Sequence, residues 1–527
     1  MFDLVLSGGD VVDGTGAPRL RADVGITAHE VTAIGKLDDA ETRETIDVSG
    51  LILAPGFIDT HAHSDGALLN DPQHENGIRQ GITTEIIAQD GMSFAPLSPE
   101  NYRAHRQYLG GILQQPPEDL NTSSIATFLD RFDAQGTACN VVMLVPHGPI
   151  RLESLGFTDQ PLEAEPLDVA RRLVAEGMQQ GARGLATGLS YYPQSYSTTE
   201  ELTSLCEVVA EHDGVYVTHV RNHNNDRAFG DGGVREALEI GRRSGVKVHI
   251  SHYRTSVPDA GQLGPLLEDI DAAKANGVNV TIECYPYVVG STVPGYFLPG
   301  EFHEGGAEGL LALLDTDDGY SRAVAALEAR NGVVDGGFWT FIASKANADL
   351  VGLSFPDAAA LRETTVERMM LNVLHEERMA CGFRYVPSGS IARVRQVEAD
   401  IMQLLDRDDY MIGSDAIPLP GLPHPRAYGC FPRFVGRLRR RHNRPLEQVV
   451  QRVTQNPARR FNLERRGEVR EGFVADLVVF DEREIIDLAS YEDPALPPAG
   501  IPYVLVNGEV AVNRDGCTGV LAGRTVR

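Results

Sequence analysis

The chain has 527 residues and a formal net charge of −27 at pH 7, because 74 acidic side chains outnumber 47 lysines and arginines. This charge disfavours nucleic acid and anionic membrane surfaces as partners, since both are bound mainly by clustered basic residues. The sequence contains no run of about 18 apolar residues, and its first residues, MFDLVLSGGD, lack the pattern of a secretory signal.

Both ends of the chain carry short alternating segments that predict strands. The N-terminal region contains DLVLSG, ADVGITAHEVTAIG and TIDVSGLIL, which are cut by glycines. The C-terminal region shows the same pattern in VADLVVF and YVLVNGEVAVN. The economical interpretation is one small β domain, a β-sandwich, built from residues 1–54 and 466–527.

Between these ends, short apolar runs alternate with helical stretches. Strands are predicted at residues 56–63, 83–90, 140–147, 182–188, 215–220, 246–252, 278–286 and 409–415. Most of these predicted strands end in polar, ionisable residues. Eight βα units with functional groups at the strand ends predict a (β/α)8 TIM-like barrel over residues 55–465. A doubly wound open sheet is the structural alternative, but no G-x-G-x-x-G turn follows the first strand.

The connection between the seventh and eighth predicted strands is too long for a single βα link. Residues 286–408 form an insertion that contains loops and helical pieces, among them AVAALEARN and VERMMLNVLHEERM. Long insertions after barrel strands are usually lids or binding loops. We therefore expect a lid or binding region here.

Histidines at strand ends predict a metal site. His61 and His63 stand two residues apart after the first strand, so both side chains point the same way and can chelate. An isolated H-x-H is more often a pair of loop residues. However, His219, His252 and Asp415 end the fifth, sixth and eighth strands. Each alone fits a core residue or a helix cap; together the five predict a metal site, and imidazole favours Zn.

With these residues, the chain resembles the metal-dependent amidohydrolase superfamily, in which H-x-H is followed by His, His and Asp at later strand ends. It is similar in detail to the N-acyl-D-amino-acid deacylases (D-aminoacylases) in PGFIDTHAHSD, RQGITTEIIAQDGMSFAP, ATGLSYYP, THVRNH, ISHYR, ECYPY and IGSDAIPLPGLPHPRAYG. The likeness spans nearly the whole chain. It implies a hydrolase that cleaves the linear amide bond of a small-molecule N-acyl-D-amino acid. It also implies one or two divalent metal ions, Zn or another, with Asp415 as general base.

One position departs from the family pattern. Where the deacylases have a cysteine in an N-C-G turn after the second strand, this chain has Gln89-Asp90-Gly91. Asp90 thus takes the place of a thiolate ligand, as a harder and less zinc-selective carboxylate that can also bridge two metals. The alternative is a turn residue before Gly91. The ligand set implied by the resemblance is His61, His63, Asp90, His219, His252 and Asp415.

Four further residues are candidates for substrate binding. Arg254 stands two residues beyond His252, matches a basic position of the deacylases and is a candidate partner for the substrate α-carboxylate. Tyr191 in GLSYYP matches a family tyrosine, and Arg426 in HPRAYG is a second candidate cation. Tyr285, at the tip of the seventh strand, is placed to donate to a tetrahedral oxyanion. The alternatives are salt bridges for the arginines and a core role for Tyr285.

The other histidines and the cysteines are not predicted to be metal ligands. His147 is interpreted as a residue that supports the ligands or as structural, His249 as structural, and His223 and His424 as loop residues. Six scattered cysteines without C-x-x-C predict free thiols in a reducing cytoplasm.

Two alternative functions stay open: a cyclic amide hydrolase like the dihydropyrimidinases and dihydroorotases, and a catalytically silent barrel that serves as an interaction protein. HPRAYG and GLSYYP favour the deacylase, and the intact ligand set disfavours the scaffold. The sequence predicts no oligomeric state.

Overall fold

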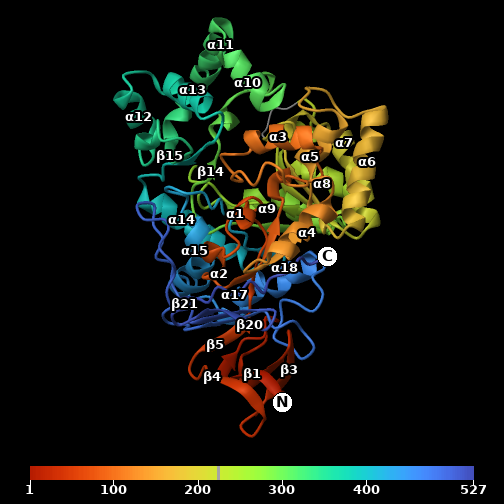
Figure 1. Ribbon diagram of the computed structural model, residues 1–527, viewed down its shortest axis with the longest axis vertical. Coiled ribbons are helices and arrows are strands. Elements are labelled where there is room, and N and C mark those ends of the chain that lie inside the picture. The colour runs from red at the N-terminus through yellow and green to blue at the C-terminus, as the bar shows by residue number, and fades with distance from the viewer. Residues whose placement is uncertain (222–225, 331) are drawn as a thin grey trace.

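The computed structural model describes residues 1–221, 226–330 and 332–527 and has a mixed α/β architecture. Strands from the two chain ends lie at the lower end of the molecule in Figure 1. Helices and parallel strands fill its middle, and a segment that includes α10 (Gly306–Leu314) and α13 (Val366–Glu376) lies at its upper end. The molecule is therefore elongated, with the parallel strands between two peripheral parts.

Strands from both chain ends share one nine-stranded sheet. Its strands are β1 (Phe2–Val11), β2 (Leu20–Thr27), β3 (Glu30–Gly35), β4 (Thr42–Asp47), β5 (Ile52–Pro55), β18 (Leu477–Phe480), β19 (Tyr503–Val506), β20 (Glu509–Asn513) and β21 (Gly516–Cys517). β5 pairs antiparallel with β18 and so joins the two ends. Alternating residues, such as Leu4 with Leu6 and Leu477 with Val479, turn toward a hydrophobic cluster separate from the main core.

The parallel strands form two sheets that meet. β6 (Phe57–Asp59), β7 (Ile82–Ile87) and β8 (Asn140–Met143) form one; β9 (Val145–Pro146), β10 (Gly184–Gly188), β11 (Val215–His219), β12 (Lys247–Ile250), β13 (Val280–Glu283) and β17 (Tyr410–Met411) form the other. Only Leu144 separates β8 from β9. Beyond β6 and β17, Ala62 forms a parallel bridge with Ala416. The carboxyl ends of all these strands therefore lie at the same edge.

The stretch 140–147, predicted as one strand, is divided in the structure. Residues Asn140–Met143 pair with β7, whereas Val145–Pro146 pair with β10. The pairing with β7 ends at Met143 and the pairing with β10 begins at Val145, so the hydrogen-bonded ladder is interrupted at Leu144. The other predicted strands of this region each overlap one observed parallel strand.

Helices connect the parallel strands in chain order. They are α1 (Ala67–Asn70), α2 (Glu75–Ile78), α3 (Pro99–Tyr108), α4 (Ile125–Gln135), α5 (His147–Ser154), α6 (Ala164–Gln179), α7 (Thr199–Glu211), α8 (Gly233–Ser244) and α9 (Leu263–Ala275), with α15 (Arg426–Pro432), α16 (Arg439–Arg441), α17 (Leu446–Val453) and α18 (Gln455–Arg460) after β17. The spacing in α6 buries Ala170, Val174 and Met178. Gly181 follows this helix with φ +107°, a conformation that glycine adopts without strain.

The insertion between β13 and β17 contains a sheet that was not predicted. β14 (Ser291–Thr292), β16 (Cys381–Tyr385) and β15 (Gly337–Ile342) form an antiparallel sheet in this order. The helices α10, α11 (Asp317–Glu328), α12 (Phe355–Leu361), α13 and α14 (Ile391–Leu404) belong to the same insertion. The fully buried Trp339 packs against Phe355, with ring centroids 4.6 Å apart. The insertion is thus a packed unit with its own aromatic centre.

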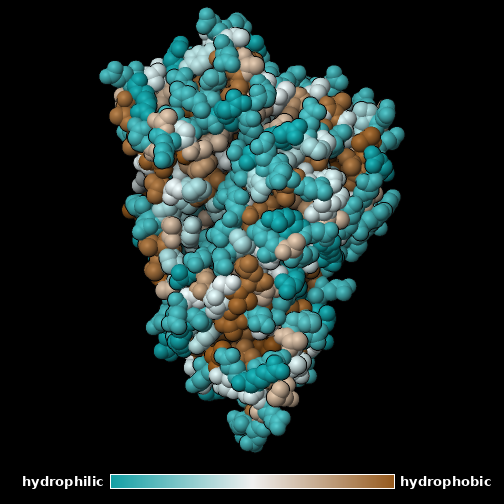
Figure 2. Space-filling view, viewed as in Figure 1, coloured by the Kyte–Doolittle hydropathy of each residue, from teal (hydrophilic) through white to brown (hydrophobic). Residues whose placement is uncertain are grey.

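Hydrophilic residues cover most of the face shown in Figure 2, and apolar residues are scattered over it, with one larger group in its lower middle. No helix among the described residues is both long enough and apolar enough to cross a membrane. All six cysteines are free thiols, and only Cys517 is not buried.

Candidate metal centre

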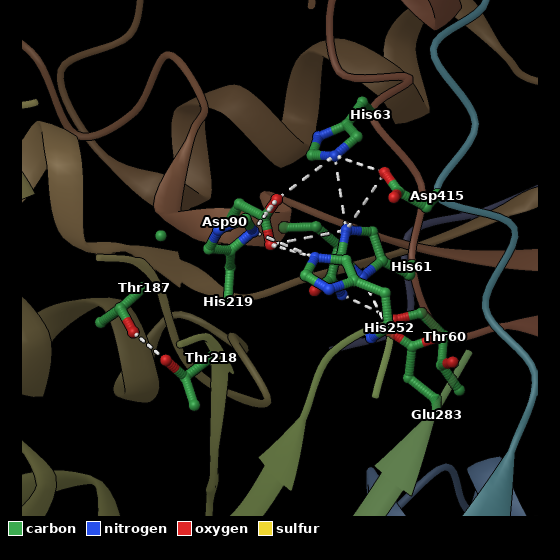
Figure 3. A network of polar contacts seen from close by, with 12 residues as sticks. Thr60, His61, His63, Asp90, Thr187, Thr218, His219, His252, Glu283 and Asp415 are labelled. Carbon is green, nitrogen blue, oxygen red and sulfur yellow. Dashed lines mark hydrogen bonds and ion pairs between the residues drawn. The ribbon is translucent and has the colours of Figure 1, made fainter. Parts of the chain in front are cut away.

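Six side chains with metal-binding atoms gather at the carboxyl ends of the parallel strands. His61 and His63 follow β6, Asp90 follows β7, His219 ends β11, His252 follows β12, and Asp415 follows β17. Their side chains point toward one another above the strands in Figure 3. The edge at which the parallel strands end therefore brings together residues from distant parts of the chain.

The four imidazoles form two pairs, and Asp90 lies between them. His61 Nε2 is 3.3 Å from His63 Nε2, and His219 Nδ1 is 3.1 Å from His252 Nε2. The Asp90 carboxylate approaches the first pair at 3.6 Å from His61 Nε2 and 3.7 Å from His63 Nε2. It approaches the second pair at 3.6 Å from His219 Nδ1 and 3.9 Å from His252 Nε2. Asp90 is thus shared by both pairs.

Asp415 presents one oxygen to the imidazoles and the other to an arginine. Its Oδ1 lies 3.2 Å from His63 Nε2 and 3.7 Å from His61 Nε2. Its Oδ2 forms an ion pair with Arg426 Nη1 at 2.8 Å. The guanidinium therefore fixes the rotation of the carboxylate and leaves Oδ1 directed toward the donor cluster.

The donor set fits divalent cations. Three groups of three donor atoms lie within 4.8 Å of one another: His61 with His63 and Asp90, Asp90 with His219 and His252, and His61 with His252 and Asp415. Asp90 Oδ1 is buried without a hydrogen-bond partner among the described residues. Such burial is costly, and coordination removes the cost. Imidazole and carboxylate together suit Zn²⁺ and other divalent ions, so these residues fit one or two of them.

The surroundings of both carboxylates in the cluster favour the ionised form. Burial alone would raise the pKa of Asp90, but the nearby His61 and His219 hold it well below the ordinary value. Burial likewise opposes ionisation of Asp415, yet the neighbouring Arg426 and His61 lower its pKa. Two buried carboxylate anions facing four imidazoles make an environment that favours a bound cation.

Three of the donors sit on a left-handed backbone. The φ angles are 53° for Asp90, 38° for His252 and 52° for Asp415. For residues other than glycine this conformation costs about 1–3 kcal/mol each, and it clusters at functional sites because the surroundings enforce it. The fold therefore holds these donors in place against a local preference for other conformations.

Of the predicted substrate-binding residues, the two tyrosines line a cavity and the two arginines lie over one of these tyrosines. Tyr191 and Tyr285 line a cavity of about 150 Å³ next to the donor cluster, and the Tyr191 hydroxyl is 3.0 Å from Thr292 Oγ1. The guanidinium groups of Arg254 and Arg426 lie over the Tyr285 ring, at 5.2 and 4.5 Å from its centroid. Arg426 already pairs with Asp415, whereas Arg254 Nε has no hydrogen-bond partner in the described part of the chain.

Two buried carboxyl groups beneath the cluster were not predicted. Glu283 Oε1 accepts hydrogen bonds from His61 Nδ1 and from the backbone N–H of His252, both at 2.9 Å. Asp59 Oδ1 accepts from the backbone N–H groups of His61, at 3.0 Å, and Ser414, at 2.8 Å. The available signal was strand alternation, since Asp59 precedes His61 by two residues and Glu283 precedes Tyr285 by two.

The other histidines lie elsewhere. His147 Nε2 is 3.2 Å from Glu201, and His249 Nδ1 is 2.7 Å from Thr281 Oγ1. His424 accepts a hydrogen bond from the backbone N–H of Arg426, two residues later in the same turn. His223 lies outside the described residues.

Comparison with known proteins identifies relatives along the whole chain. The family model described as "Amidohydrolase family" matches residues 44–260 and 355–512. A D-aminoacylase of Alcaligenes xylosoxydans xylosoxydans is 33% identical over 100% of this chain and 97% of that protein. A D-aminoacylase structure with a binuclear metal centre has a TM-score of 0.82, 30% identity and full coverage of both chains. An N-acyl-D-glutamate deacylase from Bordetella bronchiseptica, complexed with zinc and a phosphonate mimic of the tetrahedral intermediate, also has a TM-score of 0.82 and 30% identity, over 100% of this chain and 99% of that one.

Proposed function

The chain belongs to the amidohydrolase family, and from that premise we propose that it is a metal-dependent hydrolase of N-acyl-D-amino acids that releases a carboxylate and a free D-amino acid. The observation that carries the proposal is the convergence of His61, His63, His219 and His252 around Asp90, with Asp415 beside them. A set of six donors at strand ends has no purpose in a scaffold. Relatives that match the whole length of the chain act on acyclic acyl-D-amino acids by name, which favours this reaction over cyclic amide hydrolysis.

We propose a (β/α)8 barrel over residues 55–465 as the frame of this site. The short link between β8 and β9 and the bridge between Ala62 and Ala416 support a closed ring of eight parallel strands. Residues 1–54 and 466–527 would form the small β domain, which the shared sheet and its own hydrophobic cluster support. Residues 286–408 would be the insertion that covers the site.

Zn²⁺ is the proposed ion, with other divalent metals admitted by the carboxylate donors. The first position would be held by His61, His63, Asp90 and Asp415, and the second by Asp90, His219 and His252. A bound divalent cation supplies Lewis acidity and lowers the pKa of a water molecule from about 15.7 to about 7.

The residues of the chain then carry the proton and orient the substrate. Asp415 Oδ1 accepts the proton of the attacking water and delivers it to the leaving amide nitrogen, while Arg426 holds Oδ2 in place. Burial raises the pKa of Tyr285, so its hydroxyl stays protonated and can donate to the developing oxyanion. Arg254, whose guanidinium lies over the Tyr285 ring, is proposed to bind the substrate α-carboxylate. Tyr191, in the wall of the cavity beside the donors, is proposed to contact the substrate.

We also propose a cytoplasmic location and a small-molecule substrate as the only partner of the reaction. The six free thiols support a reducing compartment.

Elemental analysis and a substrate panel test the proposed function. The purified protein should contain about one or two equivalents of divalent metal, and it should release free amine from N-acetyl-D-amino acids but not from their L-isomers or from hydantoins. A chelator should abolish this activity, and Zn²⁺, Co²⁺ or Mn²⁺ should restore it. A metal-free protein that chelators leave unchanged would support the scaffold alternative. Turnover of hydantoins alone would support the cyclic amide alternative.

Replacing Asp90 by cysteine is expected to raise the preference for Zn²⁺ over Mn²⁺. The thiolate is softer than the carboxylate that Asp90 now places between the two imidazole pairs. A shift of about 10-fold in the affinity ratio is the scale on which single changes around a metal act. Competition titrations with a chromophoric chelator measure it, and Asp487→Cys, at a buried aspartate away from the cluster, is the control. An unchanged ratio would remove Asp90 from the ligand set.

A further inference from the structure

Glu283 lies at the centre of the strand ends that carry the donors. It is the last residue of β13, whose neighbours in the sheet are β12, followed by His252, and β17, followed by Asp415. Figure 3 places its side chain beneath His61 and His252, on the strand side of the cluster. The residue is 0% exposed. A carboxyl group at such depth requires hydrogen-bond partners, and the partners it has are specific.

One oxygen of Glu283 holds parts of both imidazole pairs. Oε1 accepts from Nδ1–H of His61 and from the backbone N–H of His252, each at 2.9 Å. The first bond fixes the His61 tautomer, because a donating Nδ1 leaves the lone pair on Nε2, the atom that faces Asp90. The second bond fixes the backbone of His252, whose φ of 38° lies in the left-handed region.

The chain just after β17 passes close to His61 and Glu283 because it carries a glycine, Gly413, at this point. A Cβ atom on Gly413 would lie 2.5 Å from His61 Cβ and 2.6 Å from Glu283 Oε2. Gly413 therefore allows Asp415, two residues later, to reach the cluster while Glu283 stays in contact with His61. Glu283 Oε2 has no hydrogen-bond partner among the described residues, so the contacts through Oε1 are what the carboxyl group contributes.

We propose that Glu283 is a positioning residue that sets His61 and His252 together for cation binding. It acts through these two histidines, one from each imidazole pair, and is not placed to touch the substrate. The inference rests on the proposed function, because it requires a divalent cation at the cluster. Loss of Glu283 should then weaken cation binding in the folded protein.

The test compares cation binding by the wild-type protein with that of Glu283→Gln and Glu283→Ala. Glutamine keeps an acceptor oxygen but loses the charge, so Kd for Zn²⁺ should rise about 10-fold, whereas alanine loses both bonds and should raise it about 100-fold. The absorption spectrum of the Co²⁺-loaded protein should change as well, because the ligand geometry changes. Glu398→Gln is the matched control, since Glu398 is also buried but pairs with Arg433 and Arg441 away from the cluster.

Each outcome has a definite consequence. If the wild-type protein binds cations and Glu283→Ala binds them equally well with the same Co²⁺ spectrum, the positioning role is wrong and the proposed function stands. If the wild-type protein binds no divalent cation, both fail. If the variants do not fold, nitrogen-15 histidine NMR of the wild-type protein decides, with the His61 signals assigned from their loss in His61→Asn. In the Zn²⁺-loaded protein a slowly exchanging proton on His61 Nδ1 is expected, and its absence would overturn the inference.

Discussion

Replacing Asp415 by asparagine is expected to lower kcat by about 10²- to 10⁴-fold while metal remains bound, the range in which a general acid–base residue acts. The amide has nearly the shape of the carboxylate and can still contact the cluster, but it cannot accept the proton of the attacking water. The low pKa of Asp415 means that the wild-type group is already ionised at neutral pH and ready to act. Turnover of an N-acetyl-D-amino acid and metal content of the same sample measure the effect.

A matched variant distinguishes loss of the base from general damage. Asp487→Asn removes another buried carboxylate that pairs with arginines, Arg433 and Arg437, outside the cluster. It should leave kcat close to the wild-type value. Full activity of Asp415→Asn with metal bound would exclude Asp415 as the base, and loss of metal from that variant would assign it mainly to ligation.

Replacing Arg151 by methionine is expected to lower the free energy of unfolding by about 3–5 kcal/mol, the usual cost of leaving a buried charge without its partner. Arg151 on α5 donates to both carboxylate oxygens of Glu201 on α7 at 2.6 Å, and both side chains are fully buried. Without Arg151, the Glu201 carboxylate keeps only His147 and the backbone N–H of Leu162 as donors among the described residues. Denaturant unfolding followed by circular dichroism measures the change.

The double variant Arg151→Met with Glu201→Leu tests the cause. Removing both charges should recover much of the lost stability, since apolar replacement of a complete buried pair is often nearly neutral. Arg172→Met, at an exposed pair with Glu176, should change little. If the double variant is no more stable than Arg151→Met, the loss comes from packing around Arg151 and not from an unpaired carboxylate.

The order of the elements could be predicted from the sequence because strand and helix periods differ so clearly in the central region. The predicted strands that carry His61, His219 and His252 each contain an observed strand, namely β6, β11 and β12. The sheet of the insertion was missed for a physical reason. β14 has two residues and pairs with β16, about ninety positions later, so neither alternation nor a turn signal marks it locally.

The donor cluster could be predicted because histidine is a metal-binding residue type and these histidines stand at the ends of apolar strands. The carboxyl groups beneath it were missed, because the two-residue spacing of Asp59 from His61 and of Glu283 from Tyr285 does not distinguish a supporting carboxylate from any other residue on the same face of a strand. Glu283 becomes meaningful only when tertiary packing brings His61 within 2.9 Å of it. The same holds for Arg426: its residue type indicates an anion partner, but only the fold brings its guanidinium to Asp415.

The pairing of β5 with β18 makes the two ends of the chain depend on each other during synthesis. An edge of β5 cannot be covered until residues 477–480 have left the ribosome, and until then it presents open backbone hydrogen-bonding groups. Any sheet that the N-terminal strands form before that point therefore has an unprotected edge. Products of premature termination would keep that edge, which makes them substrates for chaperones and candidates for aggregation.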